Sequence, residues 1–338
     1  MKFSLFTVQD HYPQRERTVA QFYKETLEQC ILADELGFDI FFVAEHHFHE
    51  YGVFPNPAIF LAAAAQHTER IRLGPAVSVL PFRNPLNVAE DYAMLDILSG
   101  GRCVLGVGSG YLAHEFEGFG VSGAEKRERF DEALTLLRRA LHGERITFDG
   151  KYHALDDVAI NVQPIQRPHP PIYVAVLRKE AAYYVGRAGN RLISIPYASV
   201  DSFEQVEPLV TEYLRGCGEG GSDRSAEDAI IAFHTYATES DEAARREAGD
   251  AFDLYVDTRL YARKQSYDDI IRSGLALFGS VDTVVDKLVR LHAMGVRHVA
   301  MLYSFGLLDP ALITRSLRRI AEEVIPQVKE RVAAPVGA

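Results

Sequence analysis

The sequence predicts an α/β protein folded as a closed (β/α)8 barrel, that is, a TIM barrel. Continuous apolar runs, typical of strands that are buried on both faces, alternate with segments in which apolar residues recur at helical spacing. Glycine falls where many of these helices end, and Asn-Pro or Asp-Pro marks where others begin. Eight strand–helix units follow one another. Eight parallel strands joined by right-handed crossovers close into a barrel.

The first two units illustrate the pattern. Residues 2–8 are a strand-like run, Val19, Tyr23 and Leu27 recur at helical spacing, and Gly37 ends that helix. An Asn or Asp followed by proline begins three further helices, at 56–57, 84–85 and 309–310. The eight expected strands cover residues 2–8, 40–44, 71–80, 103–107, 172–177, 192–195, 230–237 and 298–302.

An open, doubly wound sheet is the alternative arrangement for alternating strands and helices. Such a sheet binds dinucleotides at a glycine-rich turn, G-x-G-x-x-G, that directly follows its first strand. The corresponding turn in this chain, residues 8–11, contains no glycine. The barrel is therefore the favoured fold.

Two segments are longer than the barrel repeat. Residues 145–171, after the fourth strand, contain Asp149-Gly150 and several prolines, which predicts a hairpin and an extended entry to the fifth strand. Residues 240–278, after the seventh strand, are highly charged but carry Tyr255, Tyr261, Tyr267 and Phe278. A long insertion at the active-site end of a barrel is a candidate lid, and a solvated helical insertion without a role is the alternative. We expect residues 1–332 to be one barrel domain and 333–338 to be a flexible tail.

Composition excludes several classes of protein. The 338 residues include 36 Lys plus Arg against 47 Asp plus Glu, a net charge of -11, which argues against a nucleic-acid binder. No apolar run approaches the roughly 18–20 residues that cross a bilayer, and the first residues lack the apolar core of a signal peptide. Cys30, Cys103 and Cys217 have neither metal-site spacing nor the pattern of a disulfide framework. A cytoplasmic protein is expected.

The second strand ends in an unusual concentration of ionisable residues, Glu45-His46-His47-Phe48-His49-Glu50. In a barrel of this kind the active site forms at the carboxyl ends of the strands. We expect one histidine to act as a general base or hydrogen-bond donor, with Glu45 fixing its tautomer. A zinc site is the alternative, but His46 and His47 are adjacent, and the chain has no H-E-x-x-H or C-x-x-C motif. No metal is therefore expected.

Two further strand ends carry candidate binding residues. The fourth strand ends in the glycine-rich run 106–111, which would let a ligand approach the backbone, although such turns are common. The fifth is followed by Arg178 and Lys179, at the start of a helix, where cations oppose the helix dipole. A bound phosphate would explain these two cations, and a solvated basic pair is the alternative. In an acidic chain they favour a phosphorylated cofactor.

Several short motifs appear in order along nearly the whole chain. They are the run 38–48 (FDIFFVAEHHF), 50–52 (EYG), 56–57 (NP), 72–74 (RLG), 80–81 (LP), 89–91 (AED), 95–96 (LD), 100–102 (GGR), Phe116 with 119–120 (FG), 279–280 (GS), 295–296 (GV) and 322–326 (EEVIP). In this order they resemble the bacterial luciferase-like flavin monooxygenases.

The resemblance implies a barrel that binds reduced FMN non-covalently, lets it form a flavin 4a-hydroperoxide with molecular oxygen, and oxygenates a small organic substrate. It also implies site residues. The flavin-facing histidine falls on His46, and its neighbouring carboxylate falls on Glu45. A non-proline cis peptide bond falls on Ala76-Val77, and the loop that contacts the flavin falls on Gly108, Ser109 and Tyr111. The site for the flavin phosphate falls on Arg178 and Lys179.

The resemblance further implies partners. No reductase signature is visible, so reduced flavin is expected from a separate NAD(P)H-dependent flavin reductase, and a homodimer is expected. We expect the substrate pocket to draw on the ends of the first and sixth strands, near His11 and Tyr197. The identity of the substrate cannot be predicted from the sequence.

The chain departs from luciferase itself in the fourth-strand loop. Luciferase has an arginine and a reactive cysteine where this chain has Ser109 and Gly108, which argues against light emission. A relative that uses a reduced deazaflavin coenzyme for hydride transfer is the nearest alternative, but such members usually lack the double histidine, so residues 45–48 favour FMN. The fold also admits a non-catalytic flavin-binding barrel, against which the intact Glu45-His46 pair argues, and a metal-dependent hydrolase.

Overall fold

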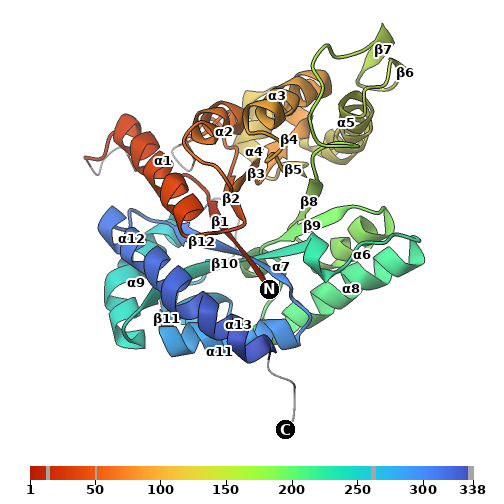
Figure 1. The fold of residues 1–338 in the computed structure, drawn as a ribbon. Coiled ribbons are helices and arrows are strands. Elements are labelled where there is room, and N and C mark those ends of the chain that lie inside the picture. The colour runs from red at the N-terminus through yellow and green to blue at the C-terminus, as the bar shows by residue number, and fades with distance from the viewer. Residues whose placement is uncertain (13–15, 50–51, 260–263, 334–338) are drawn as a thin grey trace.

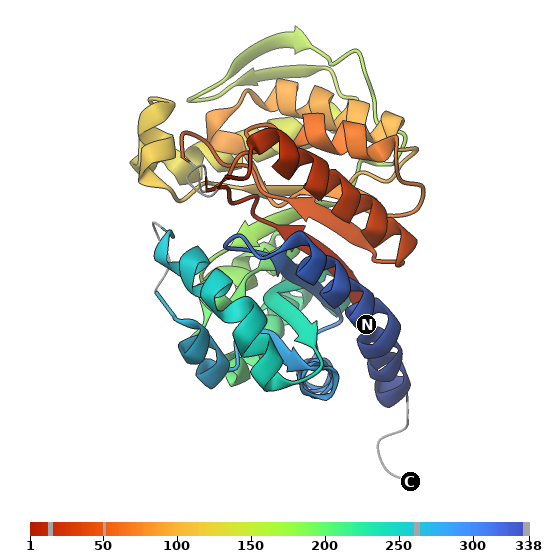
Figure 2. The same cartoon turned by 90° about the vertical axis from the view of Figure 1, so that its left-hand side faces the viewer.

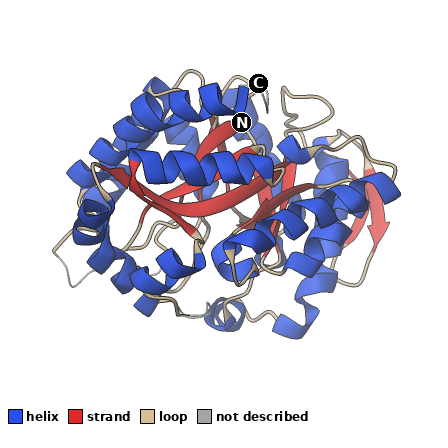
Figure 3. Ribbon diagram, turned by 90° about the horizontal axis from the view of Figure 1, so that it is seen from below, coloured by secondary structure: helices blue, strands red, loops and turns tan. Residues whose placement is uncertain are grey.

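The computed structural model describes residues 1–12, 16–49, 52–259 and 264–333. Its parallel strands form a nearly closed barrel with helices around it (Figure 1, Figure 3). The hydrogen-bonded strands follow the order β3-β2-β1-β12-β10-β9-β8-β5-β4. Leu73 of β3 and Cys103, just before β5, form a parallel bridge, which joins the first strand of this order to the last but one. The predicted (β/α)8 barrel is confirmed.

The barrel strands are β1 (Lys2–Thr7), β2 (Ile40–Val43), β3 (Arg72–Pro75), β4 (Ser78–Val79), β5 (Leu105–Gly108), β8 (Ile172–Val176), β9 (Arg191–Ser194), β10 (Ala229–Thr238) and β12 (His298–Ser304). They reproduce the eight predicted strands, except that the third is divided into β3 and β4. The peptide bond between Ala76 and Val77, in the gap, is cis. It lies at the position that the resemblance implies.

One strand is not among the eight predicted. The first half of β10 pairs with β9 and β12, whereas His234 to Thr238 pair with β11 (Ala276–Ser280). The sequence of β11 is short and lies in a highly charged segment, so its apolar residues do not stand out as a strand. All side chains of β10 are buried, because helices and strands cover both of its faces.

Helices surround the barrel, and three of them begin at the Asn-Pro and Asp-Pro pairs that the sequence marks. The helices are α1 (Val19–Glu35), α2 (Pro57–Ala65), α3 (Pro85–Leu98), α4 (Ala113–Gly118), α5 (Lys126–Leu141), α6 (Lys179–Arg187), α7 (Pro196–Ser199), α8 (Val206–Glu219), α9 (Asp241–Asp257), α10 (Tyr267–Ser273), α11 (Val281–Ala293), α12 (Pro310–Arg319) and α13 (Ile325–Ala333). Asn56, Asn84 and Asp309 cap α2, α3 and α12 with their side chains, and each is followed by proline.

The insertion after the fourth predicted strand is the expected hairpin. β6 (Ile146–Asp149) and β7 (Ala154–Val158) form a separate antiparallel sheet of two strands. The hairpin packs next to α5 (Figure 1) and lies at the outer edge of the molecule, at the top of the view in Figure 2. It therefore contributes nothing to the barrel mouth.

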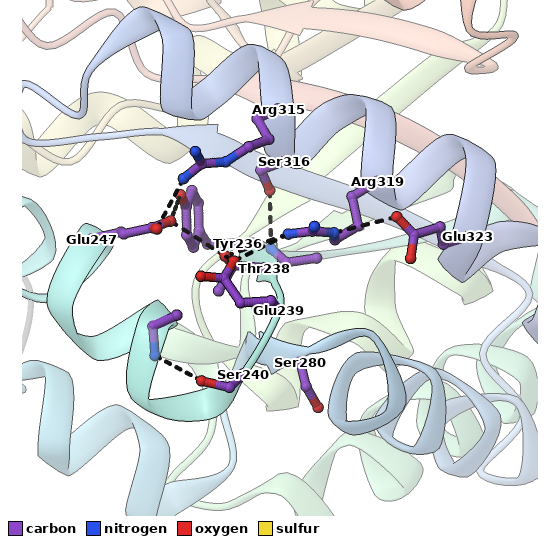
Figure 4. A network of polar contacts seen from close by, with 12 residues as sticks. Tyr236, Thr238, Glu239, Ser240, Glu247, Ser280, Arg315, Ser316, Arg319 and Glu323 are labelled. Carbon is purple, nitrogen blue, oxygen red and sulfur yellow. Dashed lines mark hydrogen bonds and ion pairs between the residues drawn. The ribbon is translucent and has the colours of Figure 1, made fainter.

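The insertion after the seventh predicted strand contains α9, α10 and β11, and Tyr261 lies outside the described residues. Figure 4 shows how α9 is attached: the carboxylate of Glu247 lies between Tyr236 of β10 and Arg315 of α12. The Arg315 guanidinium is 2.8 Å from Glu247, and the Thr238 hydroxyl, which donates to Glu239, lies 3.3 Å from the same carboxylate. These contacts fix α9 against β10 and α12.

Among the described residues, no helix is both long enough and apolar enough to cross a membrane. The chain end expected to be a flexible tail, 333–338, lies outside the described residues except for Ala333, which is the last residue of α13.

Candidate active site

A cavity of about 890 Å³ lies at the carboxyl ends of the barrel strands. This volume falls in the range of about 300–1,000 Å³ that is usual for small-molecule sites. Most of the side chains predicted from the sequence line it together. They are Glu45, His46, Ala76, Val77, Gly108, Ser109, Tyr111, Arg178, Lys179 and Tyr197. They come from the ends of strands β2 to β9, so the barrel brings distant parts of the sequence to one site.

His11 is placed differently from the other predicted residues. It is buried, but it is not among the described residues that line the cavity. Its Nε2 atom lies 2.7 Å from the carbonyl oxygen of Arg17, and its ring packs near Phe22 of α1. These contacts hold His11 against the segment that leads into α1.

His46 is positioned by a carboxylate from another element. Its Nδ1 atom lies 3.0 Å from Oε1 of Glu115 in α4, and the backbone N–H of His47 donates to the same oxygen over 3.0 Å. Both side chains are buried. Because a carboxylate only accepts hydrogen bonds, Nδ1 carries the proton of the neutral ring. Nε2 therefore carries the lone pair, and it lies 3.5 Å from the Tyr111 hydroxyl. Burial lowers the pKa of His46, while Glu115 opposes that shift.

Glu45 has a different partner from the expected one. Its Oε1 lies 3.2 Å from Nε2 of His47, and Ser78 donates to its Oε2 over 3.2 Å. The carboxylate that fixes the His46 tautomer is therefore Glu115 rather than Glu45. The adjacent histidines point to different carboxylates because neighbouring side chains of an extended segment alternate in direction. Glu50 and Tyr51, which follow in the sequence, lie outside the described residues.

The glycine at the end of β5 serves packing as well as access. A Cβ atom on Gly108 would lie 2.6 Å from Cγ2 of Val77, closer than two carbons can approach. Gly108 therefore leaves room for the valine that follows the cis peptide bond, and both residues line the cavity. Substitution of Gly108 would move the Val77 side chain and with it the cavity wall.

The start of α6 is suited to an anion. Arg178 is its N-cap residue, no side chain caps the free amides of the first turn, and both Arg178 and Lys179 line the cavity. Neither cation forms an ion pair with any residue that the structure describes. Lys126 and Arg127, at the start of α5, line the same cavity. Arg127 pairs with Asp131 over 2.9 Å, whereas Arg178 and Lys179 accompany the backbone amides and the dipole at the start of α6, an arrangement that binds phosphate.

Sequence reasoning missed several cavity residues, above all Glu115 and His234, whereas Tyr255, which also lines the cavity, belongs to the insertion expected to be a lid. A signal for Glu115 was present: Leu112, Glu115, Phe116 and Phe119 have helical spacing, which places one carboxylate among apolar residues. A carboxylate on a buried helix face requires a buried partner. His234 had no such signal, because it lies inside an ordinary apolar strand.

Among the residues that the structure describes, no three His, Cys, Asp or Glu side chains are grouped so that they could hold a metal ion.

Comparison with known proteins gives the family. The model of a family described as luciferase-like monooxygenase matches residues 1–298. The chain belongs to this family. The flavin-dependent trigonelline monooxygenase, oxygenase component, of Acinetobacter baylyi is 27% identical over 98% of this chain and 96% of its own length. The crystal structure of the monooxygenase RslO1 from Streptomyces bottropensis is 30% identical, with a TM-score of 0.84 over 96% of this chain and 99% of that one.

One relative is named for the deazaflavin coenzyme F420. An F420-dependent glucose-6-phosphate dehydrogenase of Microbacterium testaceum is 28% identical over 91% of this chain and 94% of its own length. The relatives are thus oxidoreductases, and their cofactors are of the flavin type.

Proposed function

We propose that this family member is the oxygenase component of a two-component monooxygenase, which binds reduced FMN and uses molecular oxygen to oxygenate a small organic substrate. The observation that carries the proposal is the pair of His46 and Glu115 in the cavity wall. A buried carboxylate fixes the tautomer of a buried neutral histidine, so that its Nε2 can accept a proton or a hydrogen bond on the cavity side.

The cavity residues fit the parts of FMN. Arg178, Lys179 and the uncapped start of α6 would hold the phosphate, and Lys126 adds a cation beside them. Ala76, Val77 and Gly108 would border the flavin ring, because their side chains are small or absent and leave room for a flat ring system. When bound, reduced FMN supplies the electrons that activate oxygen.

The chain's own residues would control water and protons. His46 accepts or returns a proton at Nε2 while Glu115 keeps Nδ1 protonated. Tyr255 of α9 lines the cavity, and α9 is fixed through Glu247. This wall would keep water from the reacting groups, which is the role proposed for the insertion 240–278 as a lid.

A reduced deazaflavin used for hydride transfer is the second candidate. The similarity to an F420-dependent dehydrogenase over most of the chain favours it. FMN is preferred because the double histidine is built into the site: His46 lines the cavity and His47 holds Glu45.

The proposal is tested by anaerobic titration with photoreduced FMN, followed by rapid mixing with oxygenated buffer. We expect saturable binding and a transient absorbance that outlives the reaction of free reduced FMN with oxygen. His46→Ala should keep FMN binding but lose oxygenated product, and unchanged turnover in this variant would overturn the role of His46. Binding of the reduced deazaflavin instead of reduced FMN would move the protein to the hydride-transfer branch.

A separate NAD(P)H-dependent flavin reductase is proposed as the partner. The trigonelline relative is named as an oxygenase component, which supports a division of labour. The purified chain with FMN and NADH or NADPH should consume neither nucleotide until a reductase is added. Dependence on such a reductase agrees with a cytoplasmic location.

A homodimer is proposed through the face formed by α2 and α3. These helices lie side by side, and four apolar side chains on them are exposed: Ile59, Met94, Ile97 and Leu98. A second copy of the chain would remove them from water. Light scattering should give a dimer for the wild type and a monomer for the double variant Ile59→Glu, Ile97→Glu. Tyr184→Glu, which changes an exposed side chain of α6, should leave the dimer intact.

A further inference from the structure

His234 has an environment unlike that of the other buried histidines. It lines the cavity from β10 and is 1% exposed, and neither ring nitrogen has a hydrogen-bond partner among the residues that the structure describes. The others are satisfied: His11 contacts the Arg17 carbonyl, His46 contacts Glu115, and His298 contacts Ser4 over 2.7 Å. Buried polar groups without partners are rare in native proteins, so a ligand that supplies one is favoured.

Aromatic rings surround this histidine. Tyr197, Phe252, Tyr255 and Phe305 have ring centroids 5.4, 5.1, 5.0 and 6.0 Å from that of His234, all in edge-to-face arrangement. Tyr197 and Tyr255 line the cavity with it. Next to His234 the cavity wall therefore carries two tyrosine rings, with Phe252 and Phe305 packed behind the histidine, and a wall of aromatic rings suits a cyclic or aromatic molecule.

The histidine is neutral in this pocket. Burial lowers the pKa of His234 to about 3, and the positive charge of Arg259 contributes to the shift. Arg259 is itself accompanied by a carboxylate, since its guanidinium lies 3.8 Å from Asp10, and it stacks 3.6 Å from the centroid of the Tyr255 ring. A neutral imidazole provides one N–H donor and one lone pair. An uncharged oxygen on the ligand matches it better than a free carboxylate or ammonium group.

We propose that His234 anchors the substrate by a hydrogen bond and that the substrate is an uncharged cyclic or aromatic compound with a carbonyl or hydroxyl oxygen. This inference rests on the proposed oxygenase function, because it names the substrate class of the same cavity. The anchor lies on β10, whereas the phosphate-binding cations follow β8 and His46 follows β2. Substrate and flavin phosphate would thus be held by residues of different strands.

Two probes of the same shape test the anchor: acetophenone, and α-methylstyrene, in which a methylene group replaces the carbonyl oxygen. Binding of each to the full-length chain is measured by calorimetry, with and without reduced FMN under anaerobic conditions. Selective 15N labelling of histidine reports the ring nitrogens of His234 directly. The wild type should prefer acetophenone by roughly three- to tenfold, the value of one added hydrogen bond, and the His234 nitrogen resonances should shift.

Variants separate the anchor from packing. His234→Phe should abolish the preference by losing acetophenone affinity, and His234→Gln should retain part of it. Thr235→Val is the matched control, because Thr235 is the next residue of the same strand, donates only to the Phe233 carbonyl oxygen over 2.9 Å and does not line the cavity. Any one of three results would overturn the proposal. The wild type could bind the two probes with equal affinity, the preference for acetophenone could survive in His234→Phe, or the His234 resonances could respond to neither probe. Failure of reduced FMN to bind would refute the proposed oxygenase function but not the substrate anchor, because the two probes are also compared in the absence of flavin.

Discussion

Glu115 of α4 and His46, which follows β2, form a hydrogen bond of 3.0 Å between Oε1 and Nδ1, although 69 positions separate them in the chain. The same oxygen accepts the backbone N–H of His47. One carboxylate therefore fixes both the ring and the backbone of the histidine segment. Glu115 acts through His46, so it is a positioning residue, and its loss should change the titration of His46 as well as the rate.

The first prediction concerns Glu115→Gln, which keeps an oxygen acceptor but removes the charge. Because Glu115 raises the pKa of His46, its neutralisation should lower that pKa further and move the pH profile of product formation to lower pH. We expect a fall in turnover of roughly 10- to 100-fold, with reduced-FMN affinity nearly unchanged. Glu117→Gln, on the same helix, is the control. A lower rate with an unshifted pH profile would contradict the pairing.

The sequence was sufficient for the fold because the barrel is local and repetitive. Each strand is a continuous apolar run, and caps such as Asn56, Asn84 and Asp309 fix where helices begin. Tertiary context decided the exceptions. The β11 segment becomes a strand only because the far half of β10 offers it an unpaired edge.

The candidate site was predictable where motifs mark strand ends. His46 and Arg178 follow strands directly and line the cavity, as expected. Nearness in sequence makes Glu45 the expected partner of His46, but extended chain directs Glu45 to His47. Glu115 and His234 reach the cavity from a helix face and a strand interior, which only the closed barrel brings together.

The second prediction concerns Gly52, which packs against His46, the proposed catalytic histidine. A Cβ atom at this position would lie 2.6 Å from Cβ of His46, so Gly52→Ala must displace that residue. We expect product formation to fall by at least about tenfold, since small displacements of reacting groups are costly. Gly218→Ala, where a Cβ meets nothing within 4 Å, is the control and should leave activity unchanged. Full activity of Gly52→Ala would show that the position of His46 is not critical.

The third prediction concerns the phosphate. The double change Arg178→Ala and Lys179→Ala should weaken reduced-FMN binding by roughly 10- to 100-fold, because charge-assisted hydrogen bonds are lost. Binding of reduced riboflavin, which has no phosphate, should change little. Arg187→Ala, in the last turn of the same helix, is the matched control. If FMN binding is unaffected, Arg178 and Lys179 are a solvated basic pair. If the binding of FMN and of riboflavin weakens equally, the two residues stabilise the fold and do not bind the phosphate.

The fourth prediction concerns stability against acid. Burial lowers the pKa of both His234 and His298 to about 3, whereas an unfolded histidine titrates near 6.5. As the pH falls below about 6.5, the unfolded chain binds these protons first, so the stabilising contribution is complete above that pH and is lost progressively toward pH 3. Each histidine should lower the free energy of unfolding by about 1.4 kcal/mol per pH unit in this window.

Urea unfolding between about pH 7 and 5 checks this slope before most carboxylates titrate. His298→Gln should be less stable at neutral pH, because its contact with Ser4 changes, but its slope should be smaller by about 1.4 kcal/mol per pH unit. His67→Gln, which removes an exposed histidine, controls for the loss of a histidine as such. A free energy of unfolding that does not vary with pH in this range would contradict two neutral histidines in the barrel core.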